Sequence, residues 1–233
     1  MKRFWKNAEV VEAGKGYAIM LDGRRVKTPA RADLVVPTRA LAEAIASEWN
    51  ASGETVDPRA MPLTGLSNAA IDQVAPDPAR FAAELAKYGE SDLLCYRAQR
   101  PKSLVTMQEE EWDPLLDWAK RRFGAELATS QEIMHVAQPG PSVARLGDAV
   151  GTMAAFNLAG LSPLVTISGS LIVALAVYEK ALAPEDAWWA VSLDERWQAE
   201  QWGADAEAVT ALEARRRDFL AGARFLRLLD SPR

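Results

Sequence analysis

The stretch Pro184–Asp205, PEDAWWAVSLDERWQAEQWGAD, carries four of the chain's eight tryptophans and decides how the second half of the chain folds. It predicts one helix, because a proline and two acids suit its first turn and Gly203 suits its end. At about 100° per residue, the tryptophans fall on two opposite sides of this helix. A helix that is apolar on two sides has to be sandwiched, so we expect other helices around it. Asp205 is expected to cap the next helix.

Glu200 stands out in this stretch, because on the helical wheel it projects into the aromatic face that contains Trp189. A carboxylate in such a face is costly unless another group meets it. Two interpretations stay open: Glu200 pairs with Arg216 or Arg227 of the last helix, or it is kept for a partner protein. If the two helices fold back on each other, Arg216 lies roughly 12 Å too far along for a simple pairing at 1.5 Å per residue.

The run Gln198-Ala199-Glu200-Gln201-Trp202-Gly203, read as Q-x-E-x-W-G, resembles a block of the assembly chaperones that bind the α subunit of F1-ATPase before it joins the F1 hexamer. Further segments resemble that family's blocks in the same order: Pro62-Leu63-Thr64, Ala70-Ile71-Asp72, Tyr88 with Ser91-Asp92-Leu93-Leu94-Cys95-Tyr96-Arg97, and Gln108 with Trp112-Asp113-Pro114-Leu115. The resemblance covers residues 5 to 215 and includes no catalytic signature.

This resemblance implies a molecular chaperone, not an enzyme, which binds the unassembled α subunit and prevents its aggregation until assembly with β. It implies Gln198, Glu200, Trp202 and Gly203 as partner-binding residues, with Glu200 at the position of the acid associated with chaperone activity. We expect no cofactor, no metal and a monomer. Trp202 is also expected to fill core volume, because large aromatic side chains usually bury. The alternative is an enzyme or small-molecule-binding protein that uses a carboxylate-lined cleft between two domains.

Charge and cysteine content narrow the function classes further. The chain has 233 residues, a formal net charge of -5 and scattered basic residues, which argues against a nucleic-acid surface. Its basic triplet, Arg215–Arg217, has acids beside it and indicates a solvated, internally paired face. A single cysteine cannot form an internal disulfide, which fits a reducing compartment. The N-terminus resembles neither a secretory leader nor a transit peptide, so a bacterial cytoplasmic location is expected, with eukaryotic relatives in the mitochondrial matrix.

Sequence motifs for catalysis are absent. His135 and Cys95 lie in different segments without a surrounding motif, so both are expected to be structural. Gly14-Lys15-Gly16 lacks the spacing and the following Ser or Thr of a phosphate-binding loop and indicates a tight turn.

Ala149–Tyr178 contains no charged residue, yet polar residues and glycines interrupt it. Its longest apolar run, Leu171–Tyr178, is far shorter than the roughly 20 residues that a bilayer requires, so no membrane insertion is expected. We predict two buried helices that meet at 160–163, with Ser162 as the N-cap and Pro163 at the first helical position.

The first third of the chain predicts a small antiparallel sheet with a covering helix. Strands are expected near 8–12, 17–21, 24–28 and 34–36, with a hairpin turn at Asp22-Gly23 and a helix over 39–51 that Thr38 caps.

Beyond Pro58 the pattern becomes helical. Helices are expected over 77–88, from 103 or 106 to 123 with a kink or new start at Pro114, and over 206–229, with 139–141 as a loop and possible strands at 93–97 or 126–128. The predicted fold class is α+β: a small N-terminal antiparallel β-sheet with a covering helix, then a larger all-α domain. The predicted domains are 1–60 and 61–233, with a boundary at 76–78 as the alternative.

Overall fold

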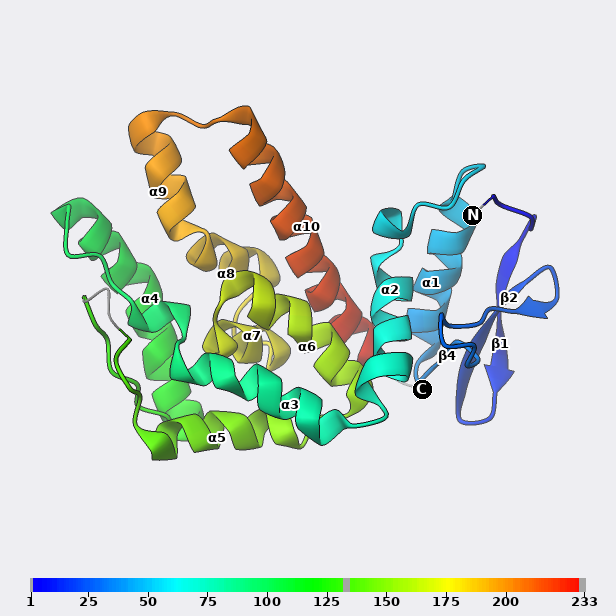
Figure 1. Cartoon of the computed structure of the whole chain (residues 1–233), viewed down its shortest axis with the longest axis horizontal. Coiled ribbons are helices and arrows are strands. Elements are labelled where there is room, and N and C mark those ends of the chain that lie inside the picture. Colours follow the sequence, from blue (N-terminus) through cyan, green and yellow to red (C-terminus); the bar gives the residue numbers. More distant parts are fainter. Residues whose placement is uncertain (1, 132–134, 231–233) are drawn as a thin grey trace. The chain divides into compact units, whose positions relative to one another are not determined.

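The computed structural model describes residues 2–131 and 135–230, which form two compact units. Unit 1 is built from the chain up to Pro78, from Ala154–Gly160 and from Arg224 onward, and unit 2 from Ala79–Met153 and Leu161–Ala223. The α+β fold is confirmed: a small antiparallel sheet precedes a series of helices (Figure 1). The domain boundary at residue 60 stays a prediction. Unit 1 also includes two segments from later in the chain, so the two units are not two consecutive stretches of sequence.

Unit 1 contains the sheet. Its elements are β1 (Ala8–Ala13), β2 (Gly16–Leu21), β3 (Arg24–Arg25), β4 (Val35–Val36), α1 (Arg39–Ala51), η1 (Pro58–Ala60), α2 (Pro62–Ala69) and the π-helical turn η2 (Ala70–Val74). β1 pairs with one side of β2, and the short strands β3 and β4 both pair with the other side, all antiparallel. The predicted turn is confirmed, since Asp22 and Gly23 both have positive φ, the conformation of a two-residue hairpin turn.

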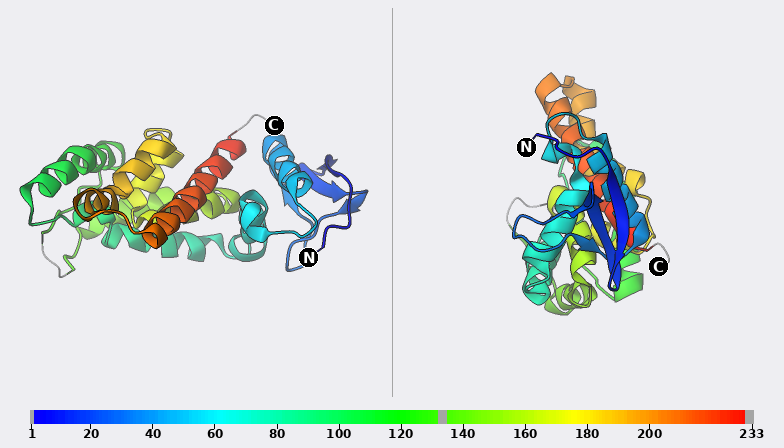
Figure 2. Two further views of the ribbon diagram at one scale, coloured as in Figure 1. Left: turned by 90° about the horizontal axis from the view of Figure 1, so that it is seen from above. Right: turned by 90° about the vertical axis from the view of Figure 1, so that its right-hand side faces the viewer.

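α1 covers the sheet as predicted. Thr38 caps it, because its hydroxyl accepts a hydrogen bond from Leu41 N (3.3 Å). Leu41, Ile45 and Trp49 lie on one face and are buried in the core of unit 1. Figures 1 and 2 show the strands and α1 side by side, in agreement with the contacts between α1 and both β1 and β2.

Unit 2 is helical. Its elements are α3 (Pro78–Ala86), η3 (Lys87–Glu90), η4 (Leu93–Cys95), α4 (Lys102–Phe123), α5 (Gly140–Gly151), α6 (Ala155–Ser168), α7 (Leu171–Tyr178), α8 (Pro184–Val191), α9 (Leu193–Trp202) and α10 (Ala206–Leu229), of which α3, α6 and α10 each contribute residues to unit 1 as well. Every residue from Leu171 to Val177 is buried, and α7 contacts α4, α8 and η3. It is therefore the central helix of this unit.

A buried carboxylate fixes the start of α7. Asp92 accepts hydrogen bonds from Leu94 N (3.1 Å) and from Ile172 N (3.0 Å), 80 residues away in the chain. Burial raises the pKa of this carboxyl to about 6, although the hydrogen bonds act in the opposite direction. The block around Asp92 therefore joins η4 to the central helix.

The helix break in the uncharged segment was predicted at the wrong place. α6 continues through Pro163 to Ser168, and the chain turns at Gly169, whose φ of 71° is in the left-handed region. The N-cap of α7 is Ser170, which accepts from Val173 N (3.0 Å), and not Ser162. None of the helices within the described residues has the length and apolar character required to span a membrane.

Two smaller predictions were also wrong, and a third was wrong in part. Gly140 and Pro141 begin α5 instead of forming a loop, because a proline in a first turn lacks only an N–H that would have no helical partner. α4 runs as one helix through Pro114, so no new helix starts there, whereas the alternative of a kink at Pro114 stays a prediction. Leu93–Cys95 is the short 3-10 helix η4, and residues 126–128 form no strand.

Candidate partner-binding site

The first part of the site is the anchorage of α8 to α4. The indole of Trp112, which is 1% exposed, donates from Nε1 to the carbonyl oxygen of Ala190 (2.8 Å). This bond fixes the last turn of α8 on the buried face of α4.

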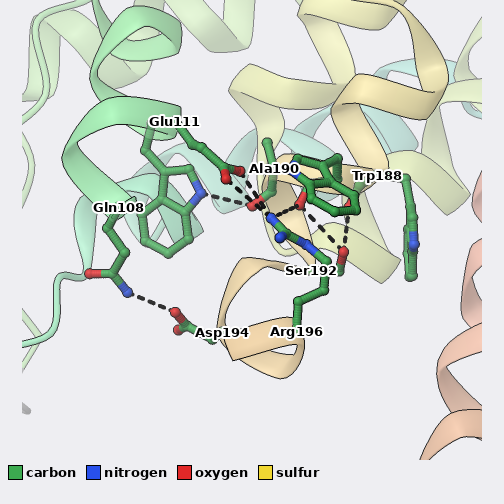
Figure 3. Close-up of polar contacts among 9 residues, drawn as sticks. Gln108, Glu111, Trp188, Ala190, Ser192, Asp194 and Arg196 are labelled. Atoms are coloured by element: carbon green, nitrogen blue, oxygen red, sulfur yellow. Dashed lines mark hydrogen bonds and ion pairs between the residues drawn. The ribbon is translucent and has the colours of Figure 1, made fainter. Parts of the chain in front are cut away.

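A second contact anchors the beginning of α9. Gln108 is 1% exposed; its Oε1 accepts from Ala98 N (2.8 Å) and its Nε2 donates to Asp194 Oδ1 (2.8 Å), a pair that Figure 3 shows. Burial raises the pKa of the Asp194 carboxyl, and the neighbouring charge of Glu195 acts in the same direction, whereas the bond from Gln108 lowers it. The sequence block that contains Gln108 and Trp112, one of those that resemble the chaperone family, thus holds α8 and α9 in place.

Arg196 makes the third contact. Its Nη2 lies 3.2 Å from both carboxylate oxygens of Glu111 and donates to the carbonyl oxygen of Trp189 (3.1 Å) (Figure 3). The guanidinium carbon stacks 3.5 Å from the centre of the Trp189 ring. Trp189 is 56% exposed, so the cation covers part of an aromatic surface that would otherwise face solvent.

The predicted single helix is two helices, and this prediction is corrected. Ser192 separates α8 from α9, and its hydroxyl donates to the carbonyl oxygen of Trp188 (2.8 Å). A serine hydroxyl that bonds to the backbone of the preceding turn competes with regular helix geometry. Pro184 at the start and Gly203 at the end were predicted correctly.

The end of α9, Gln198–Gly203, is the candidate partner-binding tip. Gln198, Glu200, Trp202 and Gly203 are all exposed there, and Trp202 is 74% exposed. Its ring makes an edge-to-face contact with buried Trp197 (5.5 Å between ring centres). Trp202 was predicted to fill the core, and this is wrong, because the contacts of α9 with α4 described above come from its first four residues. A wheel shows which residues share a side, not which side is covered.

Gly203 ends the tip in a conformation that glycine alone adopts readily. Its φ of 82° and ψ of 158° lie in a region that a side chain makes costly. Its N–H bonds to the carbonyl oxygen of Ala199 (2.9 Å), and Asp205 then caps α10 by accepting from Ala208 N (3.1 Å), as predicted. The turn between α9 and α10, orange in Figure 1, is thereby held at both ends.

The charges around the tip are mostly acidic. Glu195 pairs with Arg215 (2.8 Å) and Glu213 with Arg216 (3.6 Å). Glu200 has neither an ion pair nor a side-chain hydrogen bond with any residue that the structure describes. Of the two proposed internal partners, Arg216 pairs with Glu213, and neither Arg216 nor Arg227 pairs with Glu200. The exposed carboxylate of Glu200 is therefore available to another molecule.

The thiol of Cys95, which was expected to be structural, is not activated as a nucleophile. Cys95 is buried, and burial, followed by the nearby Asp92 carboxylate, raises the pKa of its thiol to about 12. The Nδ1 atom of His135 lies 3.0 Å from the hydroxyl of Tyr96. Across residues 2–131 and 135–230, no three His, Cys, Asp or Glu side chains are grouped to hold a metal ion.

Sequence reasoning missed two further exposed apolar residues, one on α8 and one near the start of α10. Trp189 was assigned to the sandwiched face, and Val209, which is 45% exposed, was assigned to the apolar stripe of the last helix. The only sequence signal for Val209 is its position near the start of α10, beside the Gly203 turn.

The fold is α+β, and the exposed aromatic ring and carboxylate at the end of α9 are features common in protein-binding surfaces. The family described as ATP12 chaperone protein matches residues 2–120. The mitochondrial protein atp12 of Schizosaccharomyces pombe is 26% identical over 219 residues, covering 89% of this chain and 75% of its own length. The crystal structure of Atp12 from Paracoccus denitrificans is 41% identical, covers 98% of both chains and has a TM-score of 0.92. A crystal structure of a protein from Agrobacterium tumefaciens is 39% identical with a TM-score of 0.94, covering 98% of this chain and 86% of that one.

The chain therefore belongs to the family of ATP12 chaperone proteins, which are assembly factors for ATP synthase. The family match over residues 2–120 and the two Atp12 relatives together confirm the resemblance to this family, although the Q-x-E-x-W-G block at 198–203 lies outside the matched range.

Proposed function

We propose that this protein is a non-enzymatic assembly chaperone that holds the unassembled α subunit of F1-ATPase and shields the apolar surface that the subunit later offers to β. Release follows when β competes for that surface. We place the partner-binding site at the tip of α9, with Gln198, Glu200, Trp202 and Gly203 as its residues.

The observation that carries this proposal is the state of Glu200. It is an exposed carboxylate without an internal partner in the chain described here, beside a tryptophan that is 74% exposed. An exposed aromatic ring is a common anchor of protein interfaces, and a nearby charge contributes specificity. The tip supplies both within one exposed helix end, and the chain belongs to a chaperone family.

Co-expression with the F1 α subunit tests the proposal. The wild-type chain is expected to keep the α subunit soluble and to co-elute with it in size-exclusion chromatography. Glu200→Lys is expected to abolish both effects. Glu110→Lys is the matched control, since Glu110 is an exposed acid on α4 and the substitution makes the same change in charge.

Three outcomes contradict the proposal in different ways. If the wild-type chain neither co-elutes with the α subunit nor keeps it soluble, the chaperone function is wrong. If Glu110→Lys fails as badly as Glu200→Lys, net charge matters and the tip does not. If native mass spectrometry of the purified chain shows a bound metabolite and no α subunit binding, a small-molecule-binding function replaces the proposal.

A further inference from the structure

The first strand of the sheet has a free edge. β1 pairs only with β2, from Ala8 opposite Leu21 to Ala13 opposite Gly16. In an antiparallel pair, successive residues alternate between bonding to the partner strand and pointing their N–H and C=O away from it. Every second residue of this six-residue edge strand therefore turns its main-chain N–H and C=O away from β2.

The hydrogen bonds show which residues point outward. Asp22 N donates to Asn7 O (3.1 Å), so Asn7 faces β2, and by alternation Glu9 and Val11 do as well. Ala8 faces away, because its N–H and its carbonyl both bond to the side-chain amide of Asn50 (2.7 and 2.9 Å). The same alternation turns the main-chain groups of Val10 and Glu12 to the free edge, where no described residue bonds to them.

A groove runs between this edge and α1. Its volume is about 440 Å³; Glu9 and Val10 line the strand side, and Glu43, Ala46 and Asn50 are on the helix side. The amide of Asn50 occupies the place that a residue of a neighbouring strand would take at Ala8, so it closes one end of the groove and leaves Val10 and Glu12 as the next pairing positions.

Charge decides which occupant fits. Glu9, Glu12 and Glu43 are exposed acids at or beside the groove, and the one basic residue that lines it, Arg39, already lies 3.4 Å from Glu43. A second copy of β1 would bring Glu9 and Glu12 of both chains to one short seam, and like charges across strands are destabilising. A basic strand meets the acids with opposite charge.

We propose that the edge of β1 is a docking site for an extended, basic segment of a partner protein. The segment adds as a strand that bonds to the main chain of Val10 and Glu12, with lysine or arginine side chains on the face of Glu9 and small apolar side chains on the opposite face, over Val10 and Ala46. Main-chain bonds provide affinity in this mode of recognition, and side-chain pockets provide specificity. The proposal does not depend on what the α9 tip binds.

The test uses the full-length protein and the synthetic peptide acetyl-Thr-Lys-Val-Lys-Val-Thr-amide, followed by amide hydrogen exchange in NMR spectra. Saturating peptide is expected to slow exchange at Val10 and Glu12 at least 10-fold. Exchange at Glu9 and Val11, whose amides already bond to β2, is expected to change less than 2-fold. The same peptide with glutamate in place of lysine is expected to bind at least 10-fold more weakly.

Two variants separate the backbone and charge contributions. Val10→Pro removes the outward N–H, at a position where edge strands tolerate proline, and is expected to weaken binding at least 10-fold. The double variant E9K and E12K keeps the backbone intact and is expected to weaken binding to a similar extent. If Val10→Pro does not fold, the double variant still decides the question.

The proposal is overturned if the peptide leaves exchange at Val10 and Glu12 unchanged, or if it binds the double lysine variant as tightly as the wild type. It is also overturned if exchange at these two amides slows as the protein concentration rises without peptide, because the occupant is then a second copy of the chain.

Discussion

The two ends of α9 differ in almost every physical respect, although one continuous helix of ten residues joins them. At its base, Asp194 and Arg196 each bond to a side chain of α4. At its tip, Glu200 and Trp202 face solvent. The tip is thus carried by a base whose polar groups are bonded to α4, an arrangement that suits binding to another protein.

The comparison also shows that two sequence blocks that resemble the same family can have different physical roles. The Gln108 and Trp112 block is buried and holds the helices together, whereas the Q-x-E-x-W-G block is exposed. We therefore expect substitutions at the base to change stability and substitutions at the tip to change binding.

The largest expected difference is between two tryptophans. Trp112→Ala empties buried volume and leaves the carbonyl of Ala190 without its donor, so we expect a loss of about 3 to 5 kcal/mol in the free energy of unfolding. Trp202→Ala removes an exposed ring and is expected to cost at most about 1 kcal/mol. Urea unfolding midpoints measure both. Equal losses would show that the tip is part of the core.

The next largest effect compares a buried acid with its amide. The pKa of Asp92 is about 6 in the folded protein and about 3.9 in an unfolded chain, so between these values the folded state holds a proton that the unfolded state has released. Raising the pH from 4 to 7 therefore removes about 2 kcal/mol of stability through this group, because the unfolded carboxyl is already partly ionised at pH 4.

Asp92→Asn does not titrate, so its stability relative to the wild type should improve by that amount between pH 4 and pH 7. Unfolding curves of both proteins at the two pH values measure this difference. A gap between the variants that is constant with pH would mean that Asp92 is ionised at an ordinary pKa.

A matched pair of glutamines sharpens the comparison of base and tip. Gln108→Ala leaves Ala98 N and Asp194 without their buried partner and is expected to cost about 1 to 3 kcal/mol. Gln198→Ala, at the exposed tip, is expected to change stability by no more than about 0.5 kcal/mol. Thermal and urea unfolding of the two variants provide the test. A larger loss of stability in Gln198→Ala than in Gln108→Ala would contradict the distinction between a structural base and an exposed tip.

The smallest expected stability effect belongs to Glu200→Lys. Because Glu200 is exposed and pairs with no described residue, we expect a change within about 0.5 kcal/mol and a melting temperature within a few degrees of the wild type. Circular dichroism melting curves measure it. A loss close to that of Trp112→Ala would assign Glu200 to the structure and would remove the basis for a partner-facing role.

Local signals in the sequence were sufficient where neighbouring residues alone decide the conformation. Asp22-Gly23 specified its turn and Thr38 its cap, because each acts through backbone groups a few residues away. The break at Gly169 was missed because Gly160 and Pro163, three residues apart, were the stronger local signal. The break at Ser192 was missed because a serine within a helical pattern gives almost no signal.

The helical positions of the candidate site residues were predictable from the sequence, but the exposure of their side chains was not. Periodicity placed Trp188, Trp189 and Trp202 on helix faces, but the packing of α4 and α7 determines which of them is covered. The groove beside β1 was missed entirely. The two glutamates of AEVVEA could have indicated an edge strand, because charged side chains are common at sheet edges.

The burial of Cys95 has a practical consequence for following the tip in solution. With the pKa of its thiol at about 12, this cysteine is protonated at pH 7 and is expected to react slowly with maleimides. It is also the only cysteine in the chain. A cysteine introduced at position 201 could then carry a fluorophore or a spin label with little background labelling, so the approach of a partner to the α9 tip could be timed directly, without removing a native residue from the core.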